Sequence, residues 1–218
     1  MQDLNARNHA VRNLGNRGIA LVAIVVVGGS GRGVGKTALV CGLLAALPEF
    51  CWIAVKIAGH AHRLSDSIWE QKAGAGQGSG TARYLAAGAH RSLLMTALGT
   101  AEPVTTEKDE LGQALQQLMQ MQGPGVHLIF ESNRILQYVE PDLCLAIAGG
   151  PERMHKPSFA AVVERMDAMV VHADRDRVVA GATPAFHLAD FERISPQMLA
   201  WLRDRLSSSG HRQLKTDH

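Results

Sequence analysis

The sequence is poor in cysteine, in aromatic residues and in net charge. Its 218 residues include three cysteines, which are far apart and form no Cys-x-x-Cys pair, so neither a disulfide framework nor a zinc knuckle is expected. Aromatic residues make up 5%, and 22 basic side chains nearly balance 20 acidic ones. Because the large clustered positive charge of a nucleic-acid-binding protein is missing, we expect no nucleic-acid partner. Buried, reduced thiols and a cytoplasmic location are expected instead.

The sequence also lacks a long hydrophobic run. Arg12 and Arg17 precede the apolar residues 18–27, which superficially imitates a signal peptide. This run continues directly into a glycine-rich segment without a cleavage site, and it is shorter than the roughly 20 residues that span a bilayer. We therefore expect no membrane segment. Residues 1–17 are interpreted as a polar leader, 18–206 as one domain and 207–218 as a polar tail.

Apolar runs alternate with helical patterns along the chain. Strands are predicted at 19–27, 51–57, 92–98, 126–130, 143–148, 168–172 and 186–189, and helices at 36–47, 81–88, 108–122, 159–166 and 196–206. Because the strands are apolar throughout, both faces of their sheet should be covered. The sequence therefore predicts an α/β fold, a doubly wound and mainly parallel sheet with helices on both faces. Residues 58–80 and 174–184 show no convincing period and are expected to be irregular.

A glycine-rich segment joins the first predicted strand to the first predicted helix. Successive backbone N–H groups in such a loop can turn toward one anion, and the following helix N-terminus adds partial positive charge. Its candidate nucleotide-binding residues are Gly31, Arg32, Gly33, Val34, Gly35, Lys36, Thr37 and Ala38. In a phosphate-binding loop (P-loop), the lysine contacts the β- and γ-phosphates and the threonine hydroxyl binds Mg²⁺. The strict pattern has glycine where this sequence has Ser30.

A P-loop protein usually carries an acidic residue at the end of a second buried strand. Glu131 directly follows the apolar run 126–130, so it is the candidate for binding Mg²⁺ through water or for orienting an attacking water. Lys36 and Glu131 are thus the candidate catalytic residues, and Thr37 and Glu131 the candidate metal ligands. The guanine-reading sequence Asn-Lys-x-Asp is absent, so ATP and GTP both remain open as ligands.

The second predicted strand ends in a basic segment that contains Lys56, His60 and His62. Since residues two apart project to the same side of an extended chain, the two histidines can converge on one ligand. Metal binding with Asp66 as a third ligand, contact with an anion or substrate, and ordinary loop histidines all remain open. Lys56 is a candidate phosphate or substrate contact.

These motifs together resemble those of the molybdopterin-guanine dinucleotide biosynthesis adaptor protein B family, in the signal-recognition/MinD/BioD class of P-loop NTPases. The resemblance covers about residues 20–172: the glycine-rich loop, the sequence Val-Lys at 55–56 followed by histidines, residues 80–89 around Tyr84, and Phe-Glu-Ser at 130–132. Gly80 stands where the family's pattern has an acidic residue. The resemblance implies a P-loop NTPase fold and a role in cofactor biosynthesis.

We therefore expect a Mg²⁺-dependent ATP- or GTP-binding protein with slow hydrolysis, acting as an adaptor or accessory factor in cofactor biosynthesis. Lys56, His60, His62 and Arg83 are its candidate contacts to an unidentified small-molecule substrate or partner protein. The alternative is a small-molecule kinase or ligase resembling dethiobiotin synthetase, in which Lys56, His60 and Arg83 hold the acceptor of the γ-phosphate. A binding module without turnover also remains open, as does a homodimer.

Overall fold

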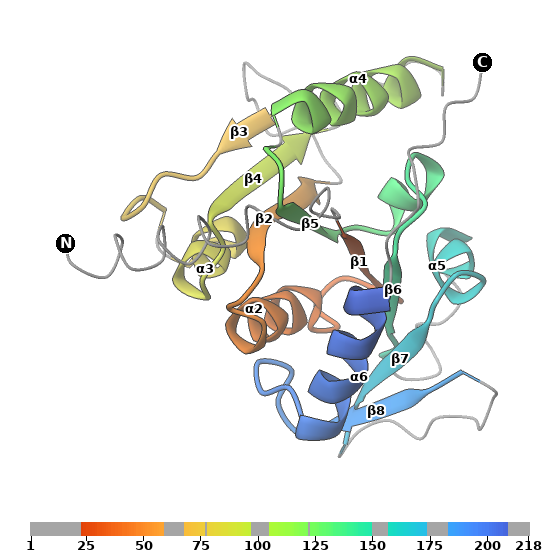
Figure 1. The fold of residues 1–218 in the computed structure, drawn as a ribbon. Helices are drawn as coiled ribbons and strands as arrows, with labels where there is room; N and C mark the ends of the chain where they lie inside the picture. Colours follow the sequence, from red (N-terminus) through yellow and green to blue (C-terminus); the bar gives the residue numbers. More distant parts are fainter. Residues whose placement is uncertain are drawn as a thin grey trace.

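The structure, a computed structural model, describes residues 23–58, 68–76, 78–96, 105–121, 123–149, 157–173 and 183–208. Their eight strands form one sheet in the order β3-β4-β2-β5-β1-β6-β7-β8 (Figure 1). The strands are β1 (Ile24–Gly29), β2 (Cys51–Ala58), β3 (Ile68–Glu70), β4 (Arg91–Thr96), β5 (Val126–Glu131), β6 (Leu143–Ile147), β7 (Ala168–His172) and β8 (Ala185–Leu188). The helices are α2 (Lys36–Ala46), α3 (Gly80–Ala86), α4 (Thr105–Met121), the 3₁₀ helix η1 (Arg134–Gln137), α5 (Pro157–Val163) and α6 (Pro196–Ser208).

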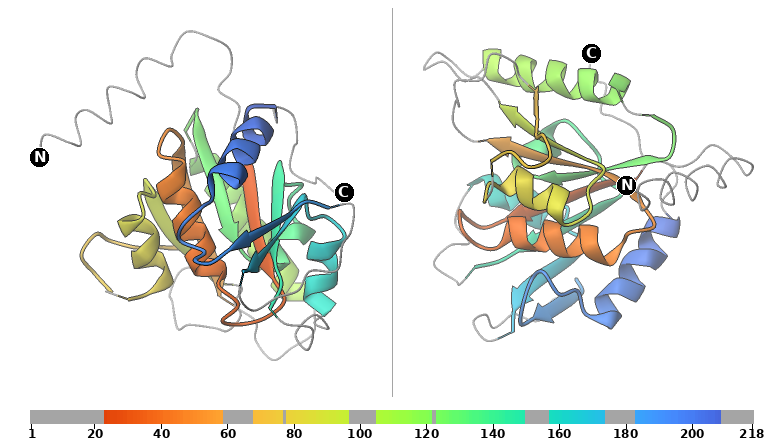
Figure 2. Two further views of the ribbon diagram at one scale, coloured as in Figure 1. Left: turned by 90° about the horizontal axis from the view of Figure 1, so that it is seen from below. Right: turned by 90° about the vertical axis from the view of Figure 1, so that its left-hand side faces the viewer.

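The sheet is parallel except at β3, which pairs antiparallel with β4 at one edge. Parallel neighbours require crossover connections, and helices in this chain provide them. Helices cover both faces of the sheet, with α2, α3 and α6 on one face and α4, η1 and α5 on the other (Figure 2). The prediction of a doubly wound, mainly parallel α/β fold is confirmed.

Side chains of β1 show why the strands are apolar throughout. Val25 and Val27 belong to the core under α2 and α6, whereas Ile24 and Val26 belong to the core under α4 and α5. Alternate residues of a strand point to opposite faces, so a strand covered on both faces must be apolar at every position. This strand carries no polar side chain and is buried at all of its positions.

Several predicted boundaries differ from the structure. The first strand begins at Ile24, with residues 19–22 outside the described residues, and the last helix runs to Ser208 rather than ending at 206. Residues 58–80, expected to be irregular, include β3. The predicted leader at 1–17 and residues 209–218 of the predicted tail also lie outside the described residues. Among the helices that are described, none has both the length and the apolar character needed to cross a membrane.

A turn rich in glycine follows β3 and is organised by one buried side chain. The Gln71 amide nitrogen donates hydrogen bonds to the carbonyls of Lys72 at 3.0 Å and Ala75 at 2.5 Å, and its oxygen accepts one from the Thr81 hydroxyl at 2.9 Å. The Ser79 hydroxyl caps α3 by accepting the Ala82 N–H at 3.1 Å. The glycines of this turn are therefore held in place by a hydrogen-bond network that leads directly into α3.

Candidate nucleotide-binding site

The strand order brings three predicted site segments to one edge of the sheet. Strand β5 lies between β1 and β2, and its Glu131 is in register with Val27 of β1 on one side and with Lys56 of β2 on the other. The glycine-rich loop leaves the same end of β1. Ligands of open α/β sheets gather beyond the carboxyl ends of the strands, where the chain changes direction across the sheet.

The loop between β1 and α2 contains two glycines in backbone conformations that other residues rarely adopt. Gly33 and Gly35 have φ angles of 75° and 104°, in the left-handed region. Gly35 caps α2 without any side-chain hydrogen bond, and the first turn of this 11-residue helix contains no acidic residue. A Cβ atom at Gly35 would lie 2.3 Å from the Phe191 ring, so this position also needs glycine for close packing. The N-terminus of α2, where Gly35 to Ala38 are half-buried, suits an anion.

Ser30, the departure from the strict P-loop pattern, connects the loop to the neighbouring strand. Its hydroxyl accepts a hydrogen bond from the Gly149 N–H at 2.8 Å, and its own N–H donates to the Ile147 carbonyl at 3.0 Å. The side chain is fully buried. Serine thus performs a structural role here, because it anchors the first turn of the loop to the end of β6.

The two charged side chains of the loop differ in their surroundings: Lys36 contacts the loop backbone, whereas Arg32 is exposed. The Lys36 ammonium donates a hydrogen bond to the Gly31 carbonyl at 2.6 Å, so it lies across its own loop. Arg32 is exposed at the tip of the loop, whereas Val34 is buried. The Lys36 ammonium is therefore held close to the backbone of the loop that precedes it.

Behind the loop, Thr37, Lys56 and Glu131 form a compact polar cluster. The Thr37 hydroxyl donates to Glu131 Oε2 at 2.7 Å. The Lys56 ammonium donates to Thr37 Oγ1 at 3.0 Å and lies 3.0 and 3.2 Å from the two carboxylate oxygens of Glu131. The exposed fraction is 31% for Lys56 and 8% for Glu131, so the carboxylate is buried and its partner reaches solvent.

Tyr84 of α3 is a fourth member of this cluster, and the sequence interpretation assigned it no role. Its hydroxyl donates a hydrogen bond to Glu131 Oε2, and its side chain is fully buried. Burial, followed by the nearby Glu131 charge, raises the pKa of Tyr84 well above the ordinary value. The phenol therefore stays protonated and remains a donor that holds the carboxylate in place.

The oxygens of Thr37 and Glu131 fit a P-loop magnesium site. Mg²⁺ in such sites takes few protein ligands and completes its octahedral shell with phosphate oxygens and water. The described part of the chain contains no group of three or more histidine, cysteine, aspartate or glutamate residues that could hold a metal by itself. The hydroxyl and the carboxylate are both oxygen donors of the kind that this ion prefers.

Asn133 fixes the end of β1 from the other side. Its amide oxygen accepts the Gly29 N–H at 2.8 Å, and its amide nitrogen donates to the Gly29 carbonyl at 3.0 Å. Both hydrogen bonds link the segment after β5 to the residue that precedes Ser30. The segment after Glu131 and the start of the P-loop are therefore tied together by the Asn133 side chain as well as by the Thr37 hydroxyl.

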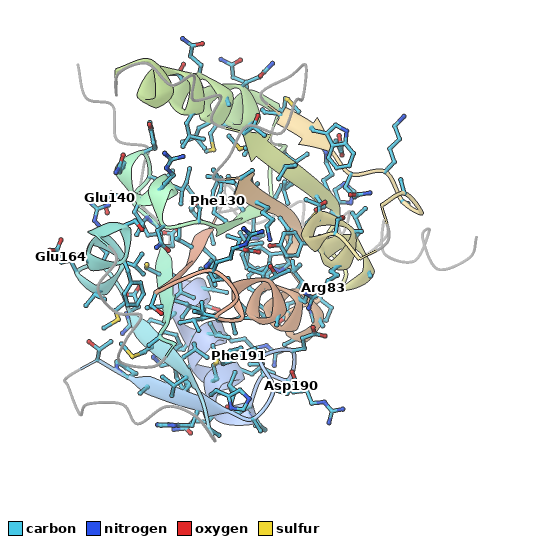
Figure 3. The ribbon with its side chains drawn as sticks, turned by 180° about the vertical axis from the view of Figure 1, so that it is seen from behind. Arg83, Phe130, Glu140, Glu164, Asp190 and Phe191 are labelled. Carbon is cyan, nitrogen blue, oxygen red and sulfur yellow. The ribbon has the colours of Figure 1, made fainter. Side chains whose placement is uncertain are left out.

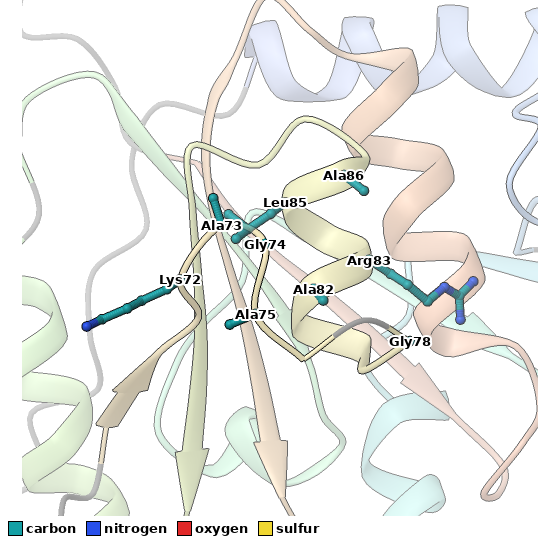
Figure 4. Close-up of a pocket in the computed structure, with 9 residues that line it drawn as sticks. All are labelled: Lys72, Ala73, Gly74, Ala75, Gly78, Ala82, Arg83, Leu85 and Ala86. Carbon is teal, nitrogen blue, oxygen red and sulfur yellow. The ribbon is translucent and has the colours of Figure 1, made fainter.

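Arg83, another predicted substrate contact, is not part of this cluster. Arg83 projects from α3 toward the segment that carries Asp190 and Phe191, and it forms an ion pair with Glu192 (Figure 3). His60 and His62, together with Asp66, lie outside the described residues. Arg83 also borders a surface pocket of about 420 Å³ between α3 and the 72–78 turn (Figure 4). That pocket is lined by none of the P-loop residues.

Comparisons with known proteins give weak likenesses in fold. No protein-family model matches the sequence, and no curated protein matches it. LpxK from Aquifex aeolicus, solved in complex with ATP, is 16% identical with a TM-score of 0.47, over 84% of this chain and 59% of that chain. The chain thus spans less than two thirds of the length of LpxK. A MobB protein homologue from Bacillus stearothermophilus is 17% identical with a TM-score of 0.42, over 85% of this chain and 98% of that chain.

Proposed function

We propose that the chain binds a nucleoside triphosphate together with Mg²⁺ at the P-loop, in the cytoplasm. The observation that carries the proposal is the contact of 2.7 Å between the Thr37 hydroxyl and Glu131 directly behind a loop with left-handed glycines. A helix N-terminus, a loop lysine and a hydroxyl–carboxylate pair at the edge of a parallel sheet form the set of groups that phosphoryl binding needs.

Each residue has a defined role in the proposal. The loop amides of residues 31–38 bind the phosphates, and Lys36 exchanges its hydrogen bond to the Gly31 carbonyl for contacts to the β- and γ-phosphates. Thr37 and Glu131 hold Mg²⁺, which when bound neutralises charge on the phosphate oxygens. Glu131 also lies where it can orient a water toward the γ-phosphate.

We further propose slow hydrolysis and a role as an adaptor or accessory factor in cofactor biosynthesis, of the molybdopterin-guanine dinucleotide type. This part of the proposal is supported by the sequence resemblance around residues 55–62, 80–89 and 130–132. Lys56, Arg83 and the two histidines remain candidate contacts to a substrate or a partner protein, and Arg83 borders a surface pocket.

Calorimetric titration with non-hydrolysable ATP and GTP analogues, with and without Mg²⁺, tests the proposal. Lys36→Ala should abolish measurable binding, a loss of about a hundredfold or more in affinity. Lys72→Ala removes an exposed lysine outside the P-loop and is the matched control. Micromolar affinity retained by Lys36→Ala would contradict the proposal. Release of nucleoside diphosphate that depends on an added metabolite would favour the kinase alternative over the adaptor.

A further inference from the structure

We propose that, while nucleotide is absent, the Lys56 ammonium occupies the position of the divalent cation and prevents free metal ions from binding there. The inference rests on the proposed function and adds a specificity role for one residue. The ammonium contacts the same two side chains that fit Mg²⁺, at 3.0 Å from Thr37 Oγ1 and at 3.0 and 3.2 Å from the Glu131 oxygens. With its three N–H donors, the lysine contacts all three oxygens that Thr37 and Glu131 offer to a metal.

The ammonium and the metal exclude each other by geometry and by charge. Mg²⁺ binds oxygen at about 2.0–2.1 Å, so a metal on Thr37 Oγ1 would lie beside an ammonium that contacts the same oxygen. The cluster contains one carboxylate and one ammonium, which balance each other. A dication added without nucleotide would leave an excess of positive charge around a carboxylate that is 8% exposed. The negative charge of a triphosphate removes this excess.

The surroundings allow Lys56 to leave while Glu131 stays. Lys56 is 31% exposed, and its side chain crosses Gly80 at the start of α3, where a Cβ atom would lie 2.9 Å from the ammonium nitrogen. Gly80 thus provides the space in which the lysine lies. The hydroxyls of Thr37 and Tyr84 still donate to the carboxylate after the lysine moves. The cluster therefore has one mobile partner and two fixed ones.

Binding of free Mn²⁺ to the nucleotide-free, full-length chain tests this role, with the electron paramagnetic resonance signal of unbound Mn²⁺ as readout. Lys56→Met should raise the affinity for Mn²⁺ by about tenfold or more. Lys72→Met makes the same charge change at an exposed position and should leave Mn²⁺ affinity at the wild-type value. The double variant Lys56→Met/Glu131→Gln should lose the gain, which assigns the new binding to this cluster.

Equal Mn²⁺ affinity in Lys56→Met and Lys72→Met would overturn the inference, as would a gain that survives in the double variant. Lys56→Gln is measured in parallel, so that a folding defect of one variant does not decide the result. Circular dichroism verifies the fold of each variant. The measurement uses no nucleotide. Failure of the unsubstituted chain to bind a triphosphate in calorimetry would therefore overturn the proposed function, whereas the Mn²⁺ titration reports separately on the competition between lysine and metal.

Discussion

The substitution Tyr84→Phe removes one hydroxyl from the buried cluster and leaves the ring in place. The hydroxyl donates to Glu131, and the ring is fully buried, so the variant creates no large cavity. A hydrogen bond to a charged group contributes about 1.5–3 kcal/mol to stability. Because Glu131 keeps its contacts with Thr37 and Lys56, we expect a loss of about 2 kcal/mol. For a chain of this size, that corresponds to a decrease in Tm of about 4–8 °C.

Urea unfolding at neutral pH measures this effect, and a double-mutant cycle with Glu131→Gln assigns it to the right partner. If the hydroxyl acts through the carboxylate, the free energies of the single variants should not add, with a coupling of about 1–2 kcal/mol. The high pKa of Tyr84 ensures that the phenol is a donor throughout the neutral range. A loss below about 0.5 kcal/mol, or full additivity in the cycle, would refute the reasoning.

Two further predictions concern Asn133, beside the P-loop, and His127, which lies at the other end of β5 from Glu131. Asn133→Ala removes both hydrogen bonds to Gly29, so unfolding free energy should fall by about 1–3 kcal/mol in urea titrations; an unchanged value would show that the backbone holds the loop without it. Burial lowers the pKa of His127, whose Nδ1 accepts the Ala23 N–H, so the unfolded chain takes up a proton more readily than the folded one. Stability from this group is therefore present above about pH 6.5 and declines below it. His127→Gln should flatten the dependence of Tm on pH between about 7.5 and about 5.5, and an unchanged slope would contradict this.

The sequence predicts most strands because burial on both faces leaves a strong local pattern. The apolar run before Glu131 forms β5, and the carboxylate ends that strand as expected. The short strand β3 was missed because three residues, of which Trp69 and Glu70 are exposed, carry no recognisable period. The turn after β3 has no regular secondary structure, as expected, but its ordering by Gln71 was not predicted, because a single glutamine in a glycine-rich segment gives no local signal.

The candidate site was predicted in part. Glycines followed by Lys36 and Thr37 indicate a P-loop from local spacing alone, and Glu131 follows from its place after a buried strand. The contacts of Lys56 depend on the order β2-β5-β1, which brings strands distant in sequence together. Tyr84 lies on a short helix with ordinary helical spacing, and only the packing of α3 against β2 and β4 brings its hydroxyl to the carboxylate.

The register between β1, β5 and β2 has a consequence for how this chain can change in length. Val27, Glu131 and Lys56 are aligned because three strands run in step. Deleting one residue inside β5 would turn every later side chain of that strand to the other face, and the carboxylate would point toward the layer of α4. A change in the length of a connection between strands does not alter which face of the sheet a side chain lies on. Natural variants of this chain should therefore gain and lose residues between the strands that carry the site, and keep the spacing within them.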